Sequence, residues 1–447
     1  MEIDVEKLQK EYFDKALQKI QDIIRIPSVR SEAKPEAPFG EGIKKVLEYA
    51  INLGTELGFK TYQDLENSYG YVEYGSGSEI FAILGHLDVV PPGDLNKWEF
   101  EPFKPQIKDD KLFGRGSIDD KGPTIINLYA LKYLKDHNYH PDYTIRLIFG
   151  LTEETDWASI KAYMKTEGVP ALGYTPDGEF PVVYTEKGII NADIIGKGEP
   201  FTLIGGEAYN SVADVVSYQG SYLDDIKTRL EQKNIETKVE NDCLIVKGKS
   251  SHGSLPERGI NAALITLATY AELDNNSVIA NFAKKHLYNN FHFSHLFPNM
   301  KDETGLLIVN NGIVEINQEK TRLTLNMRVP ISYKLHDVQN PLIEELKKYN
   351  LELTNISWQE PLHMPVDSPM IKNMMKVYQE VTGDNYTKPV AIGGGTYAKA
   401  MPNCVAFGAE FDINESTMHA YNEYVKLDDL KKMLEIYTKA IPLLTKK

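Results

Sequence analysis

The sequence predicts an α/β domain with a mainly parallel central sheet, interrupted by a smaller inserted α+β domain. Apolar strand-like runs alternate with amphipathic helices in the first part of the chain, which is typical of α/β layers. The pattern changes after "VVYTEKGII" and returns near "HMPVDSPMIKNMMKVYQEVTG". At 447 residues the chain also exceeds one ordinary core. We therefore expect a discontinuous domain of residues 1–187 and 364–447, with residues 188–363 inserted.

The elements of the first domain follow from the spacing of apolar residues. Residues 5–25 have helical spacing, and residues 41–59 predict a second amphipathic helix that ends at Gly58. The alternation then continues as a strand at 79–85, a helix at 122–137, a strand at 143–151 and a helix at 158–167. In sheets of this kind, chemistry gathers where strands end and loops begin.

The inserted domain contains two similar segments. "IKTRLEQKNIETKV" (226–239) and "LIEELKKYNLELTNI" (342–356) each predict a helix that leads through a short turn into a strand. Two copies of one unit suggest a domain of two related halves. The alternative is chance similarity between two amphipathic helices.

Composition excludes several classes of protein. A hydrophobic content of 42% and a charged content of 25% are those of a globular protein, and a net charge of −15 works against binding nucleic acid. Cys243 and Cys404 are far apart, which fits a reducing compartment and excludes a thiolate metal cluster. The amino terminus has no apolar signal region, and no run of about 18 apolar residues follows. We expect a cytoplasmic protein without membrane association.

The stretch "ILGHLDVVPPG" places a histidine and an aspartate at the end of an apolar strand. Side chains at i and i+2 of a strand share a face, so His86 and Asp88 are expected to stand together. A carboxylate beside an imidazole suits a metal ligand whose second nitrogen must be held in place. The alternative is a turn-forming pair at a strand end.

Acidic residues recur at the ends of successive predicted strands. "GRGSIDDKGP" ends with Asp119 and Asp120 before a helix, "GLTEETDW" places Glu153 and Glu154 at a strand end, and "YTPDGE" adds Asp177 in a turn. Taken singly, each could be a solvated turn. The carboxyl ends of parallel strands lie on one edge of a sheet, however, and clustered carboxylates repel one another unless a cation neutralises them.

His419, in "STMHAYNEYV", is the second candidate imidazole ligand. Divalent ions of the zinc type accept imidazole and carboxylate ligands when no thiolate is present. Two ions about 3.5–4 Å apart that share a carboxylate can polarise a carbonyl and activate a bridging water. Neighbouring residues on a strand point to opposite sides, so one glutamate of the pair would ligate a metal while the other acts as general base. Seven further histidines lack comparable acidic neighbours and are expected to be structural or exposed: His137, His140, His286, His292, His295, His336 and His363.

Taken together, these motifs resemble the M20 family of co-catalytic metallopeptidases, and within it the PepV-like dipeptidases. The matching motifs are "GHLDVVP", "GRGSIDDKGP", "TEET", "TPDGE", "KSSHGSLPERGINA", "GGGTYA" and "MHAYNEY". They occur in order over roughly residues 80 to 430. The resemblance implies a zinc-peptidase-like catalytic domain with an inserted lid.

The resemblance also implies two divalent metal ions per chain, Zn²⁺ or Mn²⁺. One ion would be held by His86, Asp119 and Asp177. The other would be held by Asp119, Glu154 and His419, with Asp119 as the bridge. An aspartate at position 177 is similar to the peptidase branches more than to the deacylating ones.

Two further roles follow from the resemblance. Glu153 matches the general base that activates the metal-bridging water, and Asp88 matches the residue that orients His86. The chain departs from the family pattern at Thr152 and Asp156, where an aspartate and a glycine are common. Neither position is a ligand in the family, so the departures concern only the positioning of Glu153.

The inserted region is similar to the family's lid domain. His252 matches the histidine that stabilises the tetrahedral oxyanion, Asn210 an asparagine near the substrate, and Arg328 the arginine that receives a substrate carboxylate. A planar guanidinium suits that task because it offers two parallel donors. The alternatives are a buried strand histidine for His252 and a surface charge for Arg328.

The loop "GGGTYAKA" is not a dinucleotide fingerprint, because it lacks the G-x-G-x-x-G spacing. Its backbone N–H groups could attract a carboxylate. In the family this loop helps to hold the carboxyl end of the substrate. The substrate contacts expected here are Gly393, Gly394, Gly395 and Thr396, and the alternative is a tight turn.

The expected activity is hydrolysis of dipeptides that have a free C-terminal carboxylate. An amidohydrolase that removes an acyl group from N-acyl amino acids would use the same metals and base, and remains the alternative. A non-catalytic binding protein should have lost a ligand or the base, and all are present. A lid of two related halves could supply internally what smaller relatives obtain from a dimer partner, so we expect a monomer.

Overall fold

The computed structural model describes residues 2–447, which form two compact units. The first unit comprises the described chain up to Tyr184, together with His363–Ala391 and Thr396–Lys447. The second comprises Thr185–Leu362 and the short segment Ile392–Gly395. The domain limits 1–187, 188–363 and 364–447 stay a prediction.

The first unit is built on a nine-stranded sheet with the strand order β1-β2-β6-β3-β7-β22-β8-β20, in which β21 pairs with β8. The neighbours β6, β3, β7 and β22 are parallel, which confirms the mainly parallel centre. The strands are β1 (Lys60–Gln63), β2 (Gly70–Tyr74), β3 (Ile80–His86), β6 (Thr144–Gly150), β7 (Leu172–Thr175), β8 (Val183–Glu186), β20 (Leu362–His363), β21 (Val390–Ile392) and β22 (Cys404–Ala406).

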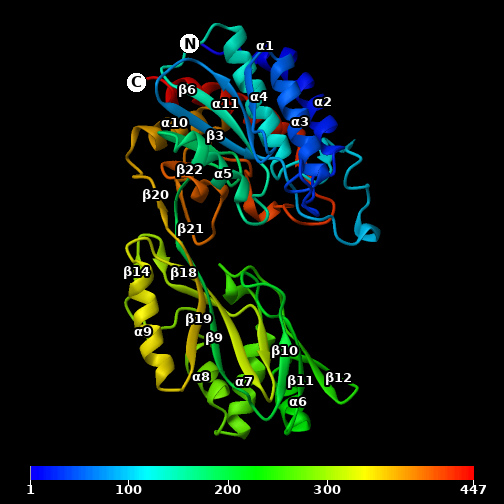
Figure 1. The fold of residues 1–447 in the computed structure, drawn as a ribbon, viewed down its shortest axis with the longest axis vertical. Coiled ribbons are helices and arrows are strands. Elements are labelled where there is room, and N and C mark those ends of the chain that lie inside the picture. Colours follow the sequence, from blue (N-terminus) through cyan, green and yellow to red (C-terminus); the bar gives the residue numbers. More distant parts are fainter. Residues whose placement is uncertain (1) are drawn as a thin grey trace. The chain divides into compact units, whose positions relative to one another are not determined.

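Helices flank this sheet (Figure 1), and the π-helical turn near the start of the chain contacts the last helix. The helices are α1 (Val5–Leu8), α2 (Asp14–Ile24), α3 (Glu41–Glu56), α4 (Lys121–Asp136), α5 (Ala158–Glu167), α10 (Pro369–Thr382) and α11 (Leu427–Leu444). A π-helical turn, η1 (Gln9–Phe13), joins α1 to α2. Short 3-10 turns are η2 (Leu95–Lys97), η4 (Tyr397–Ala400) and η5 (Ile413–Glu415). A small sheet combines β4 (Gln106–Lys108), β5 (Lys111–Phe113) and β23 (Tyr424–Lys426).

Helix α4 holds strands of the central sheet in place. It is buried along most of its length and packs against α2 and α11, as its run of apolar residues requires. The Tyr174 hydroxyl donates to Asn127 Oδ1 at 2.5 Å, which ties β7 to α4. The predicted helix at 158–167 matches α5. The helix predicted for 41–59 ends earlier, at Glu56, and Gly58 has a φ of +80° just beyond it.

The second unit contains an antiparallel sheet with the strand order β12-β13-β11-β10-β17-β18-β9-β19, in which β16 pairs with β18. Its strands are β9 (Gly188–Lys197), β10 (Thr202–Gly205), β11 (Val215–Gln219), β12 (Glu236–Glu240), β13 (Cys243–Lys247), β16 (Ile308–Asn310), β17 (Val314–Ile316), β18 (Lys320–Val329) and β19 (Glu352–Gln359). A hairpin is formed by β14 (Lys301–Asp302) and β15 (Gly305–Leu306). The helical elements are α6 (Leu223–Gln232), η3 (Pro256–Arg258), α7 (Ala262–Leu273), α8 (Val278–His286) and α9 (Leu335–Lys347).

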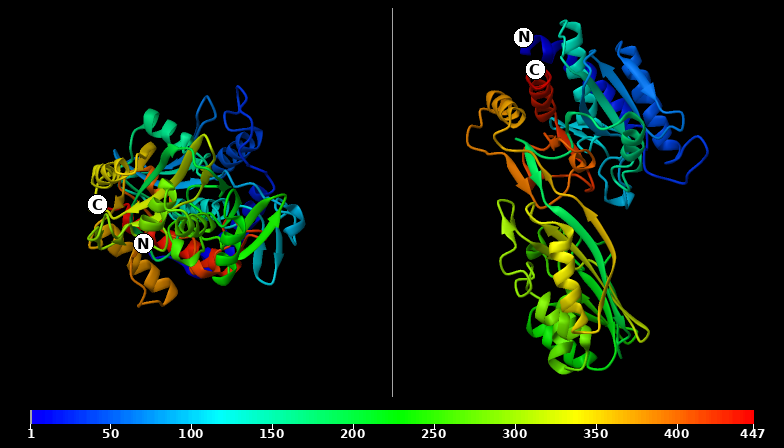
Figure 2. Two further views of the ribbon diagram at one scale, coloured as in Figure 1. Left: turned by 90° about the horizontal axis from the view of Figure 1, so that it is seen from below. Right: turned by 60° about the vertical axis from the view of Figure 1, so that its left-hand side comes forward.

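Both predicted helix-to-strand segments of this unit are confirmed. The first is α6 followed by β12, and the second is α9 followed by β19. The two strands stand at opposite ends of the strand order, so the related segments flank one sheet. The helices share one apolar core with the strands, and Figure 2 shows α9 running along the sheet.

Within residues 2–447, no helix is both long enough and apolar enough to cross a membrane. The longest helix, α11, has 18 residues and carries charged residues along its length.

The separate core of the second unit leads to a stability prediction. Leu325 on β18 is fully buried in that core, whereas Ile204 on β10 is 48% exposed. We expect Leu325→Ala to lower the free energy of unfolding by about 2–5 kcal/mol, because it leaves a cavity. Ile204→Ala should change it by no more than about 0.5 kcal/mol. Urea unfolding, with hydrogen exchange of β18 peptides as the local reporter, measures both, and equal losses would contradict the assignment of this core.

Candidate metal centre

The candidate ligands converge because three parallel strands end at one edge of the first unit's sheet. His86 is the last residue of β3 and is in register with Gly150, the last residue of β6. Asp177 lies two residues beyond β7, in the turn that the sequence predicted. Asp119 lies in the loop before α4, and His419 lies in the loop before β23.

The carboxylate of Asp119 faces both imidazoles at once. Its Oδ1 lies 2.9 Å from Nε2 of His86, and its Oδ2 lies 3.0 Å from Nε2 of His419. Each oxygen therefore belongs to a different group of candidate ligands. This is the geometry that a carboxylate bridging two cations requires.

The remaining candidate ligands complete two overlapping groups. Asp177 Oδ2 is 3.8 Å from Nε2 of His86, and Glu154 Oε2 is 3.0 Å from Nε2 of His419. Within each of these two groups, the ligand atoms lie within 4.8 Å of one another. The same holds for a third group, which consists of His86, Glu153 and Glu154. The structure thus brings together all residues of both expected ligand sets, and their metal-binding roles stay a prediction.

The donors fit divalent cations. The set consists of two imidazole nitrogens and several carboxylate oxygens, which suits zinc or manganese. The Nε2 atom of His86 is buried and makes no well-oriented hydrogen bond within residues 2–447, although it faces carboxylate oxygens. A nitrogen lone pair directed into a carboxylate cluster is the arrangement expected of a ligand.

The acidic cluster shifts the pKa values of both histidines and of Glu154. Hydrogen bonds to Asp119 and Glu154 raise the pKa of His419 to about 11. Burial works against charge on His86, but its contacts with nearby carboxylates, the first with Asp119, raise its pKa well above the usual value. Burial raises the pKa of Glu154 to about 7, and the charge of Asp119 adds to that effect. The cluster therefore attracts positive charge strongly.

Glu153 and Glu154 lie in a turn rather than on a strand. Because β6 ends at Gly150, the expectation that strand alternation separates the two side chains is wrong. The turn holds them instead: the indole of Trp157 donates to the backbone oxygen of Glu153 at 3.0 Å. Burial raises the pKa of Glu153 well above its usual value, and the charges of Asp177 and Glu154 raise it further.

Asp88 contacts His86 mainly through its backbone. Its carbonyl oxygen is 3.0 Å from Nδ1 of His86, whereas its carboxylate Oδ1 is 3.5 Å away. A proton on Nδ1 would donate to that carbonyl and leave Nε2 free to ligate. The Asp88 carboxylate accepts the backbone N–H groups of Glu153 and Glu154, each at 3.1 Å. Asp88 thus connects the His86 loop to the glutamate turn.

Arg328, in the second unit, is buried rather than a surface charge. It lies on β18 and is 3% exposed. Its Nε donates to Asn326 Oδ1 at 2.9 Å, and an Nη donates to the carbonyl of Gly393 at 3.4 Å. Among residues 2–447 no carboxylate forms an ion pair with this guanidinium, and burial lowers its pKa to about 10.

His252 is exposed and lies outside the regular strands, so it is not a buried strand histidine. Its Nδ1 is 2.7 Å from the hydroxyl of Ser254. The next residue, Gly253, donates its N–H to the carbonyl of Asn210 at 2.6 Å, which places the Asn210 loop beside His252. Asn310 holds that loop, because its side-chain amide donates to the backbone carbonyls of Tyr209 and Ser211, the two neighbours of Asn210.

The glycine loop approaches the same part of the second unit. A Cβ on Gly393 would lie 3.8 Å from Ser254 Cβ and 3.5 Å from a methyl group of Ile308. Gly393 therefore lies near both Arg328 and the His252 loop. Gly394 and Gly395 follow in the same unit, whereas Thr396 belongs to the first unit, where its hydroxyl accepts the N–H of Ala398 at 3.2 Å.

Comparison with known proteins identifies the family of this chain. Residues 82–442 match the model of Peptidase family M20/M25/M40. The chain belongs to this family. It is 34% identical over 464 residues to a Staphylococcus aureus protein named "Putative dipeptidase", with 98% of each chain covered.

Solved structures share the fold of this M20-family chain. An M20 family metallo-carboxypeptidase from Sulfolobus solfataricus has a TM-score of 0.60 at 18% identity, covering 97% of this chain and 99% of that one. Human carnosine dipeptidase 1 also has a TM-score of 0.60, at 13% identity, with 99% of each chain covered. At these identities the likeness concerns the fold alone.

Asp120, the second aspartate of its pair, has a role that the sequence did not reveal in this M20-family chain. Its Oδ2 accepts the backbone N–H of His86 at 3.1 Å and the hydroxyl of Thr124 at 2.9 Å. A Cβ at position 85 would lie 2.0 Å from Thr124 Oγ1, so the close approach requires Gly85. The adjacent Asp119 and Asp120 indicated a functional site in the sequence, but the sequence did not indicate that Asp120 binds the backbone of His86.

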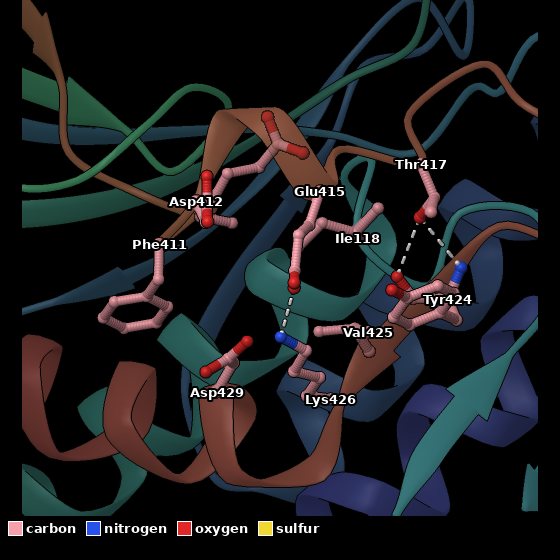
Figure 3. A pocket seen from close by; sticks show the side chains of 11 residues that line it. Ile118, Phe411, Asp412, Glu415, Thr417, Tyr424, Val425, Lys426 and Asp429 are labelled. Atoms are coloured by element: carbon pink, nitrogen blue, oxygen red, sulfur yellow. Dashed lines mark hydrogen bonds and ion pairs between the residues drawn. The ribbon is translucent and has the colours of Figure 1, made fainter.

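A pocket of about 100 Å³ lies beside the loop that carries His419 (Figure 3). Its lining includes Ile118, next to Asp119, and several acidic side chains. Figure 3 shows Lys426 paired with Glu415, and the hydroxyl of Thr417 between the backbone N–H and carbonyl of Tyr424. These two hydrogen bonds join Thr417 to Tyr424 and so close the loop that contains His419.

Proposed function

We propose that this protein hydrolyses dipeptides with a free C-terminal carboxylate, using two divalent ions, Zn²⁺ or Mn²⁺. One ion would be held by His86, Asp119 and Asp177, and the other by Asp119, Glu154 and His419. The observation that carries the proposal is the Asp119 carboxylate, whose two oxygens lie 2.9 and 3.0 Å from two different imidazoles. The dipeptidase name of the S. aureus relative supports the substrate class.

When bound, the ions would polarise the scissile carbonyl and lower the pKa of water at the centre. Glu153 would accept the proton of the attacking water. The same carboxyl group would then deliver that proton to the nitrogen of the scissile bond, so that the C–N bond breaks with a neutral amine as the leaving group. Asp88 fixes the backbone of the glutamate turn and so sets the position from which Glu153 acts.

The second unit would supply the contacts to the substrate. His252 would donate to the oxyanion, with Asn210 beside it. Arg328 and the glycine loop from Gly393 would receive the terminal carboxylate, for which a buried guanidinium without a carboxylate partner among residues 2–447 is well suited. In this proposal residues 1–187 and 364–447 act as the catalytic domain and residues 188–363 as its lid, in a monomer.

Removal of the bridging carboxylate tests the two-metal arrangement. Wild-type protein should carry two divalent ions per chain and lose activity with a chelator. Asp119→Ala should lose both ions, because Asp119 belongs to both groups, whereas Asp177→Ala should lose only one. Asp156→Ala removes a nearby acid that pairs with Arg30 and should keep both ions. Elemental analysis after dialysis measures the stoichiometry, and two ions in Asp119→Ala would contradict the bridge.

The paired glutamates allow the base to be separated from the ligand. Glu153→Gln should keep both metals but lose about 10²–10⁴ in kcat, the usual contribution of general acid–base catalysis. Glu154→Gln should instead lose metal from one group, because its Oε2 lies 3.0 Å from Nε2 of His419. Turnover of a dipeptide panel and metal content are measured on both variants. Near-normal turnover by Glu153→Gln would move the base elsewhere.

The carboxylate receptor is tested with one dipeptide and its C-terminal amide. Arg328→Ala should lower kcat/KM for the free dipeptide about 10²-fold or more, because charge-assisted hydrogen bonds are lost. The loss on the amide should be far smaller.

Arg322→Ala is the matched control, since Arg322 lies on the same strand but pairs with Asp193. It should affect both substrates equally and weakly. Equal losses by Arg328→Ala on the dipeptide and its amide would mean that Arg328 does not read the carboxylate. An N-acyl amino acid in the same panel separates peptidase from deacylase activity.

A further inference from the structure

A buried ion pair joins the loop that carries Asp119 to the loop that carries His419, two segments that are far apart in the sequence. Glu423 follows His419 by four residues and is fully buried. Arg115 precedes Asp119 by four residues and is 2% exposed. Glu423 Oε2 is 2.6 Å from an Nη atom of Arg115, so segments about 300 residues apart in the chain meet at one carboxylate.

The same carboxylate holds the backbone of the Asp119 loop. Glu423 Oε1 accepts the N–H groups of Gly116, Ile118 and Asp119, at 3.0, 3.2 and 3.4 Å. The backbone carbonyl of Glu423 accepts a further N–H, that of Gly114, at 3.0 Å. Hydrogen bonds to a carboxylate are stronger than those between neutral groups, and losing a buried acceptor leaves its donors unsatisfied. The path of the loop therefore depends on Glu423.

Arg115 offsets the negative charge that Glu423 would otherwise add beside the carboxylates of the candidate metal centre. A second unpaired negative charge beside Asp119 would add to the repulsion among the carboxylates. Arg115 neutralises Glu423, and its guanidinium lies 5.2 Å from the centre of the Trp98 ring. Its own backbone N–H donates to the carbonyl of Pro102 at 2.8 Å. Glu423 thus supplies acceptor oxygens without adding net charge to the centre.

We propose that Glu423, paired with Arg115, is a positioning residue that holds the Asp119 loop against the His419 loop so that one carboxylate spans both metals. The inference rests on the proposed two-metal centre. Buried ion pairs contribute little net stability on average, because desolvation offsets the attraction. The effect expected here is on metal affinity beyond any loss of fold stability.

Glu423→Gln tests the proposal, because the amide keeps the shape but presents an NH₂ group either to Arg115 or to the backbone donors. The full chain is stripped of metal, and Zn²⁺ and Mn²⁺ affinities are measured by competition with a chromophoric chelator. We expect a loss of about 10–100-fold, the usual effect of removing a group that orients a metal ligand.

Glu73→Gln is the matched control. Glu73 pairs with Arg146 at 2.9 Å between β2 and β6, is partly buried, and lies outside the groups of candidate ligands. It should lower the midpoint of thermal unfolding while leaving metal affinity unchanged. If Glu423→Gln also lowered stability but kept wild-type metal affinity, the pair would be structural and the proposal would be overturned.

Arg115→Lys provides a second variant in case Glu423→Gln does not fold. It keeps the positive charge and the three backbone hydrogen bonds of Glu423 but loses the planar donor group. We expect a smaller loss of metal affinity, about 3–10-fold, and an unchanged affinity would count against the proposal. Because the readout is metal affinity, a failure of dipeptide hydrolysis would overturn the proposed substrate without affecting this result.

Discussion

Hydrogen bonds from backbone N–H groups to buried carboxylates hold the metal centre of the first unit together. Asp88 accepts those of Glu153 and Glu154, and Asp120 accepts that of His86. Glu423 accepts that of Asp119. The segments that carry His86, Asp119 and the glutamate pair are thus each fixed by an acidic residue from another segment. This network explains why the ligand atoms converge even though they come from loops, which are usually the more mobile parts of a fold.

The carboxylates that hold these backbone groups, those of Asp88, Asp120 and Glu423, add to the negative charge at one edge of the sheet. The carboxylates that ligate and those that hold backbone groups are neighbours, and burial strengthens their repulsion. Two responses are visible in the structure. Arg115 neutralises the fully buried Glu423, while the imidazoles of His86 and His419 face the carboxylate of Asp119. The fold therefore gathers carboxylates at one edge of the sheet, where a divalent cation can neutralise them.

The sequence was most informative where structure is periodic. Alternating apolar runs predicted β3, β6, α4 and α5, and the parallel order of the strands explains why acidic residues from separate loops meet. The ligand sets themselves came from the resemblance to the M20 family. Periodicity does not extend beyond a strand end, which is why the turn at Glu153 was mistaken for a strand.

Contacts between distant segments were beyond the reach of the sequence. Nothing in "MHAYNEYV" indicates that its glutamate binds the backbone of residues 116–119, about 300 positions earlier. Burial was equally hidden for isolated residues in the second unit. Arg328 proved buried and His252 exposed, the reverse of the alternatives considered for them. A single charged residue on a strand can face either side, so only the packing decides.

Each unit contains a group of buried charge that bears on ligand binding. In the first unit a cluster of carboxylates surrounds His86 and His419, and in the second Arg328 is buried with neutral hydrogen-bond partners. Burying a guanidinium is costly unless its donors are used, and the carbonyl of Gly393 and the amide oxygen of Asn326 are neutral acceptors. An anionic ligand would satisfy Arg328 better than either. The buried charge of Arg328 therefore favours an anion as its partner, just as the acidic cluster of the first unit favours a cation.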